Sequence, residues 1–118
     1  MLHQFEASCG RISLTLQLVT LGKDIQLVLT GGEAHIGAVA LALASGELGH
    51  CTEIPGHREG DLTREMAVTV ARSLGVTTCV CAGIHYPAIS SAEIATVFDL
   101  VQKLTNDCLT FVRQHACC

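Results

Sequence analysis

The chain has 118 residues, the length of one domain, and 49% of them are hydrophobic while only 15% are charged. Its formal net charge of −4 argues against nucleic acid as the main partner, because phosphate contacts need clustered Lys and Arg, and its seven basic residues are scattered. A small domain this apolar has more hydrophobic surface than its own core hides, so we expect a homodimer or a larger homo-oligomer.

The first strands are predicted from strict alternation of apolar and polar residues. Residues 11–19 (RISLTLQLV) alternate in this way, and residues 25–30 (IQLVLT) repeat the pattern after a short turn that contains Gly22. Two such runs around a short turn predict a β-hairpin.

The next segment, residues 34–48 (AHIGAVALALASGEL), fits a helix by its Ala and Leu content, but Gly37 does not. Small residues alternate with large ones, so we predict a strand with an alanine face against which another layer lies close. Residues 50–54 (HCTEI) follow as a short return strand.

Two helices complete the expected elements. Residues 61–74 carry an apolar stripe of period four, with Asp61 as the expected N-cap and Gly75 as the stop. Residues 76–83 (VTTCVCAG) are a β-branched strand, and a helix over 91–114 begins with a capping box of Ser90 and Glu93.

The fold class predicted from these elements is α+β, with a mainly antiparallel sheet of four or five strands and two helices on one face, in the order β-β-β-α-β-α. We expect a single domain over residues 1–118, with a core from 10 to 114 and a flexible tail from 115 to 118.

The cellular location predicted by the sequence is the cytoplasm. The longest apolar run, IGAVALALA, is about half of what a bilayer requires. The first ten residues contain no Lys or Arg and no apolar run, so they do not resemble a signal peptide. Seven cysteines without a CxxC pair argue against a disulfide framework and a zinc ribbon, and they are expected to be reduced thiols.

Candidate functional residues lie in three short glycine-containing patches, TGGEAHIG, PGHRE and AGIHY, each with one histidine: His35, His57 and His85. If the third strand pairs antiparallel with the fourth, all three histidines lie at one edge of the sheet, where both helices also begin. Helix N-termini bind anions through free N–H groups and the helix dipole. Glycines in the patches, namely Gly31, Gly32, Gly56 and Gly83, would let a ligand approach the backbone.

Each of these residues also has a plain structural interpretation. A single histidine in a loop is most often a surface or capping residue, which is how we interpret His3, His50 and His115. Arg58 could hold a phosphate in bidentate fashion or pair with Glu53 or Glu59. Glu59 could bind a metal, contact a ligand or simply favour the helix dipole.

The paired cysteines are weaker candidates. Cys79 and Cys81 face the same side of their strand, and a CxC pair in a strand is more often core than metal site. Cys117 and Cys118 could bind a metal or cross-link oligomers.

Three ordered pieces resemble a known family: HIGAVALA at 35–42, PGHRE at 55–59, and AGIHY at 82–86 followed by a helix that opens with SSAEI. Together they resemble the small D partner proteins of gallate-type UbiD-like decarboxylases, the prenylated-flavin chaperone (LpdD-like) domains. The resemblance covers about residues 10–105. It implies an α+β protein without catalytic residues, a dimer or larger, that binds reduced prenylated flavin mononucleotide, or FMN. Such a protein would protect that cofactor or deliver it to a UbiD-like decarboxylase.

His35, His57 and His85 match the recurrent histidines of that family, and Pro55, Gly56 and Glu59 match its turn. We expect Arg58 and the backbone of residues 56–61 to hold the phosphate, and His35 and His85 to contact the ring or its polar edge. The full set expected to bind the cofactor comprises His35, Gly37, Gly56, His57, Arg58, Glu59, Gly83 and His85.

Two other classes of function remain open from the sequence. In a metal-dependent, hydrolase-like enzyme, His35, His57 and His85 would hold a divalent metal and Glu59 would act as general base. Against it, no two of these histidines share an element at metal-ligand spacing. In a purely structural oligomeric domain, the histidines would only cap and line the surface.

Overall fold

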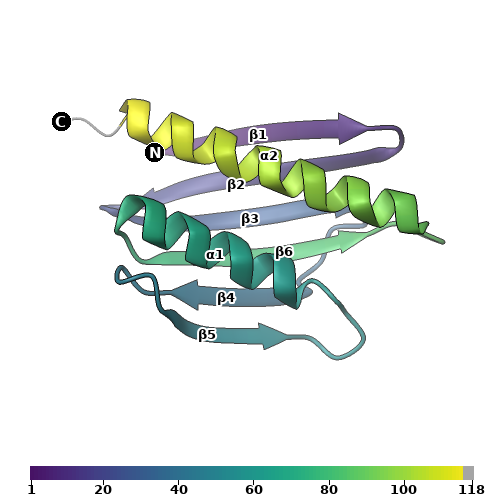
Figure 1. The fold of residues 1–118 in the computed structure, drawn as a ribbon, viewed down its shortest axis with the longest axis horizontal. Coiled ribbons are helices and arrows are strands. Elements are labelled where there is room, and N and C mark those ends of the chain that lie inside the picture. Colours follow the sequence, from purple (N-terminus) through teal and green to yellow (C-terminus); the bar gives the residue numbers. More distant parts are fainter. Residues whose placement is uncertain (116–118) are drawn as a thin grey trace.

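A computed structural model of the chain describes residues 1–115 as one six-stranded sheet with two helices on one of its faces (Figure 1). The elements are β1 (Leu2–Cys9), β2 (Ile12–Leu21), β3 (Asp24–Gly32), β4 (Ala38–Ala42), β5 (Leu48–Glu53), α1 (Gly60–Leu74), β6 (Thr78–His85) and α2 (Ser91–His115). The α+β class and the two helices on one face are therefore confirmed.

The sheet has the order β1-β2-β3-β6-β4-β5 and is mainly antiparallel, as expected, although the parallel pairing of β3 with β6 makes it a mixed sheet. Strands β1, β2 and β3 form an antiparallel meander, and β4 and β5 form a second antiparallel pair. Strand β6 enters between them, parallel to β3 and antiparallel to β4. The predicted return strand exists as β5, so the sheet exceeds the expected four or five strands because β1 is added at the other edge.

Strand β1 was not predicted, although its sequence has a period of two. Phe5 and Ala7 turn toward the helices while Gln4 and Glu6 face solvent. As an edge strand it buries only part of one face, which makes its pattern weaker than that of β2. The sheet therefore begins well before residue 10, the expected start of the core.

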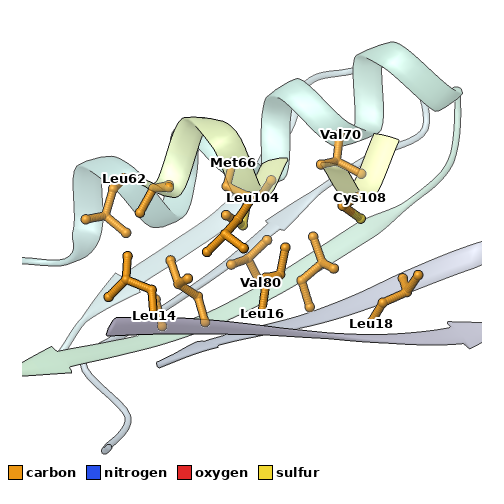
Figure 2. Close-up of a cluster of buried hydrophobic side chains, with 14 of the residues drawn as sticks. Leu14, Leu16, Leu18, Leu62, Met66, Val70, Val80, Leu104 and Cys108 are labelled. Atoms are coloured by element: carbon orange, nitrogen blue, oxygen red, sulfur yellow. The ribbon is translucent and has the colours of Figure 1, made fainter. Parts of the chain in front are cut away.

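The core lies between the sheet and the two helices (Figure 2). Strand β2 contributes three fully buried leucines, Leu14, Leu16 and Leu18, as its alternation predicts. Helix α1 packs on β4 and β6, whereas α2 packs on β1 and β2. Strand β4 presents only alanines to the core, at 38, 40 and 42, and this small-residue face lets α1 lie close to the sheet.

Several element boundaries differ from expectation by a few residues, and three of these differences affect the candidate site. Helix α1 begins at Gly60 with Glu59 in the N-cap position, so Asp61 is an exposed first-turn residue paired with Arg64 and not the cap. Strand β4 covers only residues 38–42 of the expected 34–48, because a turn at 43–46 starts the hairpin to β5. His85 is the last residue of β6 rather than a residue beyond it.

The capping box of α2 is confirmed in both directions. The backbone N–H of Glu93 donates to Ser90 Oγ, and the backbone N–H of Ser90 donates to Glu93 Oε1, each at 3.1 Å. Gly75 ends α1 in the left-handed conformation, as expected. Over residues 1–115, neither helix is long and apolar enough to cross a membrane. Cys117 and Cys118 lie outside the described residues.

Candidate functional site

The three histidine patches meet at one edge of the sheet, the edge where β3 and β6 end and β4 begins (Figure 1). Their convergence was expected only if the strand after His35 pairs antiparallel with the strand that ends at His85. The structure shows this pairing, because β4 is antiparallel to β6 and Ala38 lies opposite Ala82. His35 lies in the loop between β3 and β4, and His57 lies in the loop between β5 and α1. Both helices begin at this edge as well.

His35, His57 and Glu59 form a compact group at this edge. Each offers a ligand atom, and these atoms all lie within 4.8 Å of one another. His35 Nε2 lies 3.2 Å from Glu59 Oε1, and the rings of His35 and His57 have centroids 4.5 Å apart. Residues from two separate loops are thus brought together by the pairing of β4 with both β5 and β6.

The hydrogen bond of His35 Nδ1 shows which ring nitrogen carries a proton. His35 Nδ1 lies 2.9 Å from the carbonyl oxygen of Glu33. Because a carbonyl oxygen only accepts hydrogen bonds, Nδ1 carries the proton. In the neutral ring, the lone pair of Nε2 therefore faces the carboxylate of Glu59.

Glu59 is buried at the centre of the group, with only 7% of its surface exposed. Its Oε2 atom is buried and has no hydrogen-bond partner among the described residues. The carboxylate lies against Gly37, where any Cβ atom would overlap it. Gly37 is fixed in turn because its N–H donates to the Ala82 carbonyl and its own carbonyl accepts from the N–H of Ile54, each at 2.8 Å.

The glycines of the patches mostly accommodate the protein's own backbone. A Cβ at Gly83 would overlap the carbonyl of His35, and one at Gly32 would overlap the carbonyl of His85. At Gly56, which has φ of 88°, a Cβ would meet nothing within 4 Å. Of these three glycines, only Gly56 leaves open space beside its backbone.

His85 lies apart from the group of three. It is 54% exposed and its Nε2 lies 3.7 Å from Oε2 of Glu33, whose side chain is 83% exposed. It is not among the residues close enough to share an ion with His35 and His57. The tri-histidine arrangement considered from the sequence is therefore replaced by two histidines and a carboxylate.

Arg58 is exposed and takes part in no ion pair within residues 1–115. Its two expected carboxylate partners are engaged elsewhere. Glu53 Oε2 accepts a hydrogen bond of 2.7 Å from the N–H of Gly60, and Glu59 faces His35. The guanidinium is thus available to an anion.

The helix N-termini are less available to a ligand than the sequence implied. Glu53 occupies the first N–H of α1, and Glu93 occupies the N-terminus of α2. Each terminus already has a carboxylate of the protein as its anion. Arg58 differs from Arg11 and Arg64 at this edge in that it makes no ion pair within residues 1–115.

The sequence analysis missed three residues whose hydrogen bonds connect distant segments at this edge: Arg11, Tyr86 and Glu93. Glu93 was predicted only as part of the capping box, and it also pairs with Arg11. Arg11 Nε donates to Glu93 Oε2 at 2.7 Å, and this hydrogen bond lowers the pKa of Glu93 to about 2. Tyr86 Oη donates to the carbonyl of Ser13 and accepts from its N–H, each at 2.8 Å. Arg11 and Glu93, like Tyr86 and Ser13, are far apart in the chain, so no local sequence pattern indicates that they pair.

Two hollows lie away from this edge. One of about 110 Å³ lies between the helices and is lined by Leu62, Met66 and Phe98. A larger one of about 520 Å³ lies at the opposite end of the sheet, where Lys23 and Arg113 border an apolar lining that includes Ile25. Neither is lined by a residue of the His35–His57–Glu59 group.

Comparison with known proteins supports the family resemblance. Residues 8–113 match the model of the prenylated flavin chaperone LpdD-like domain. The chain is 28% identical over 104 residues to Protein LpdD of Lactiplantibacillus plantarum, covering 83% of this chain and 76% of that protein. Its fold is similar to a chain in the crystal structure of a novel chaperone complex for yeast 20S proteasome assembly. That similarity has a TM-score of 0.62 at 12% identity, covers 97% of this chain and 95% of the other, and concerns the fold alone. The chain belongs to the LpdD-like prenylated flavin chaperone domain family.

Proposed function

We propose that this protein binds reduced prenylated flavin mononucleotide and protects it or delivers it to a UbiD-like decarboxylase, without converting it. The observation that carries the proposal is the family match over residues 8–113, which supports a chaperone role and a prenylated flavin as the ligand. The proposal assigns no catalytic residue.

The histidine edge is the proposed place for the ligand. Arg58 is exposed and unpaired within residues 1–115, and a guanidinium binds phosphate oxygens in bidentate fashion. Next to it, Gly56 leaves the backbone of the loop open. His57 offers an imidazole group to the polar edge of the isoalloxazine ring, beside His35, whose two ring nitrogens face Glu33 and Glu59. His85 stands exposed at the end of β6.

A rival location exists in the 520 Å³ hollow at the other end of the sheet, whose volume is in the range of small-molecule sites. Lys23 and Arg113 on its border are also suited to a phosphate. The histidine edge is preferred because three patches of the family resemblance meet there, whereas Lys23 and Arg113 belong to none of them.

The test is anaerobic titration of the purified protein with reduced prenylated flavin mononucleotide, followed by absorbance and native mass spectrometry. We expect stoichiometric retention that is lost in the His57→Ala/Arg58→Ala variant and kept in the matched Lys23→Ala/Arg113→Ala variant. The opposite pattern would move the site to the far hollow. Absence of retention by the wild-type protein would remove the flavin proposal altogether.

We also propose that two copies of the chain pair through the sheet face that the helices leave uncovered. That face carries two cross-strand rows: Val28, Cys81 and Val39 in one, and Gln26, Cys79 and Leu41 in the other. Each of these side chains is partly exposed and none is charged. A neutral and largely apolar patch of this kind can face its own copy across a twofold axis without charge repulsion.

The size of this face is adequate for a dimer. With a strand spacing of about 4.8 Å and a rise of about 3.3 Å per residue, the whole six-stranded face measures roughly 600 Å² per copy. That is close to the roughly 800 Å² per partner of a standard stable interface. The neutral rows lie at its centre on β3, β6 and β4, and polar residues of β1, β2 and β5 form its rim. The free cysteines Cys79 and Cys81 would then lie in the interior of the interface.

A further inference from the structure

We infer that His35, His57 and Glu59 form a binding site for a divalent transition-metal ion of the zinc class. The inference does not depend on the flavin proposal, because it is drawn from the geometry of the three side chains. It replaces His85, which the sequence placed among the candidate ligands, by the buried carboxylate of Glu59.

The spacing of the donor atoms suits such an ion. Zinc binds imidazole nitrogen and carboxylate oxygen at about 2.0–2.2 Å, so tetrahedral ligand atoms lie about 3.4 Å apart. His35 Nε2 and Glu59 Oε1 are already 3.2 Å apart. The donor of His57 lies within 4.8 Å of both and needs only a small movement of its half-buried side chain in the loop before α1.

The hydrogen bond of His35 to the backbone gives the ring the tautomer that a ligand needs. Its Nδ1–H donates to the carbonyl of Glu33 at 2.9 Å, so in the neutral ring the lone pair of Nε2 is directed at the group. Metal-binding histidines usually donate their other ring N–H to a carbonyl or carboxylate in this way, which fixes both orientation and tautomer.

The buried carboxylate of Glu59 provides the independent observation. Burial of an ionised carboxylate is costly unless it is paired and hydrogen-bonded. A proton shared with His35 would satisfy Oε1 but leave Oε2, which is buried without a partner among the described residues. A metal ion beside the carboxylate would neutralise its charge, and coordination through both oxygens would give Oε2 a partner. Gly37 supports this placement, because a side chain there would displace the carboxylate.

The set of ligands also indicates the kind of site. Two imidazoles and one carboxylate suit zinc, cobalt, nickel and iron(II), and not calcium or magnesium, which prefer oxygen ligands. Three protein ligands leave a fourth tetrahedral position open for water or an anionic oxygen. His57 is half-buried and Arg58 is exposed, so the group can be reached from solvent on that side.

The test is titration of the metal-free protein with Co²⁺, read by visible absorbance, and with Zn²⁺ by calorimetry. The full chain would carry Cys117→Ser and Cys118→Ser, because neighbouring thiols bind zinc themselves. We expect one ion per chain, with the affinity lowered at least tenfold in Glu59→Gln and in His57→Ala. His57→Ala keeps the inference testable if Glu59→Gln fails to fold, since His57 is only partly buried.

The chain offers a matched control in its second histidine–glutamate pair. Glu33→Gln and His85→Ala change the same residue types in an exposed pair at the same edge, and they should leave the affinity unchanged. The inference is overturned if the Cys117→Ser, Cys118→Ser protein, with His35, His57 and Glu59 intact, binds no ion at submillimolar Co²⁺. It is equally overturned if His85→Ala abolishes binding while His57→Ala and Glu59→Gln retain it.

Discussion

The carboxylate of Glu59 lies against the Cα atom of Gly37, in the space that a side chain at position 37 would fill. Gly37 precedes β4 and Glu59 precedes α1, so this contact joins the two loops that carry His35 and His57. The glycine is therefore required by the packing of a buried charge and not by an unusual backbone angle, since its φ lies outside the left-handed region.

Replacing Gly37 by Ala should destabilise the protein by about 1–3 kcal/mol, because the added methyl group overlaps a buried carboxylate that has little room to move. It should also lower Co²⁺ affinity, since Glu59 is displaced. Urea unfolding and the cobalt titration measure the two effects. The control is Gly22→Ala at the far hairpin, where a Cβ meets nothing within 4 Å and only the positive φ is penalised. Equal metal affinity in Gly37→Ala and wild type would contradict the packing argument.

Replacing Arg58 by Ala should weaken binding of reduced prenylated flavin mononucleotide by about 1–3 kcal/mol if the guanidinium holds the phosphate. The measurement is anaerobic fluorescence or absorbance titration at two ionic strengths. Arg64→Ala is the matched control, because Arg64 is an exposed arginine of α1 that is already paired with Asp61. Unchanged affinity in Arg58→Ala would remove this residue from the site.

Cys108 should be the least reactive of the cysteines in residues 1–115. Burial in the core beneath α2 raises the pKa of its thiol to about 11, so almost no thiolate is present at pH 8. Timed alkylation with peptide mapping should modify the exposed Cys9 early and Cys108 only after unfolding in urea. Modification of Cys108 at the rate of Cys9 in the native protein would show that α2 is not packed as described.

The sequence was informative where a residue's role is local and uninformative where it depends on distant chain segments. The alternation of Leu14, Leu16 and Leu18 identified a half-buried strand, and the capping box at Ser90 identified the start of α2. The edge strand β1 and the parallel pairing of β6 with β3 were missed, because both are decided by which segments meet.

For the candidate site, the sequence predicted the location but not the contacts between side chains. The sequence brought three histidines to one edge of the sheet, and the pairing of β4 with β6 supports that placement. It could not assign the partner of each histidine. Glu59 pairs with His35, whereas Glu33 pairs with His85. Which glutamate meets which histidine depends on how the loop before β4 packs its backbone against Gly83.

A charge on the uncovered sheet face should break the proposed dimer. In Val28→Glu or Val39→Glu, dimerisation would bury an unpaired carboxylate in the interface, so the dissociation constant should rise at least tenfold. Analytical ultracentrifugation over a concentration series measures it. The control, Thr110→Glu, places the same charge on the exposed side of α2. A monomeric wild-type protein, or a dimer indifferent to both charges on the face, would contradict the proposal.

The Arg11–Glu93 pair should make the stability of the fold depend on pH in the acid range. Arg11 holds the pKa of Glu93 at about 2 in the folded protein, below the ordinary value of 4.5. The unfolded chain therefore takes up a proton at a higher pH than the folded protein does. The stabilisation is complete above about pH 5 and is lost as the pH falls toward 2.

Glu93→Gln is the variant that isolates this charge, because a glutamine in the third helical position still accepts the N–H of Ser90 in the capping box. Wild type should be modestly more stable than the variant at pH 6, and the difference should vanish near pH 2. The effect should shrink in high salt, since the pair is solvent-exposed. Thermal unfolding at a series of pH values measures it, with Asp99→Asn as control, an exposed carboxylate of α2 without an ion pair within residues 1–115. A difference between wild type and Glu93→Gln that stays constant from pH 6 to pH 2 would show that the contact acts through packing and not through its charge.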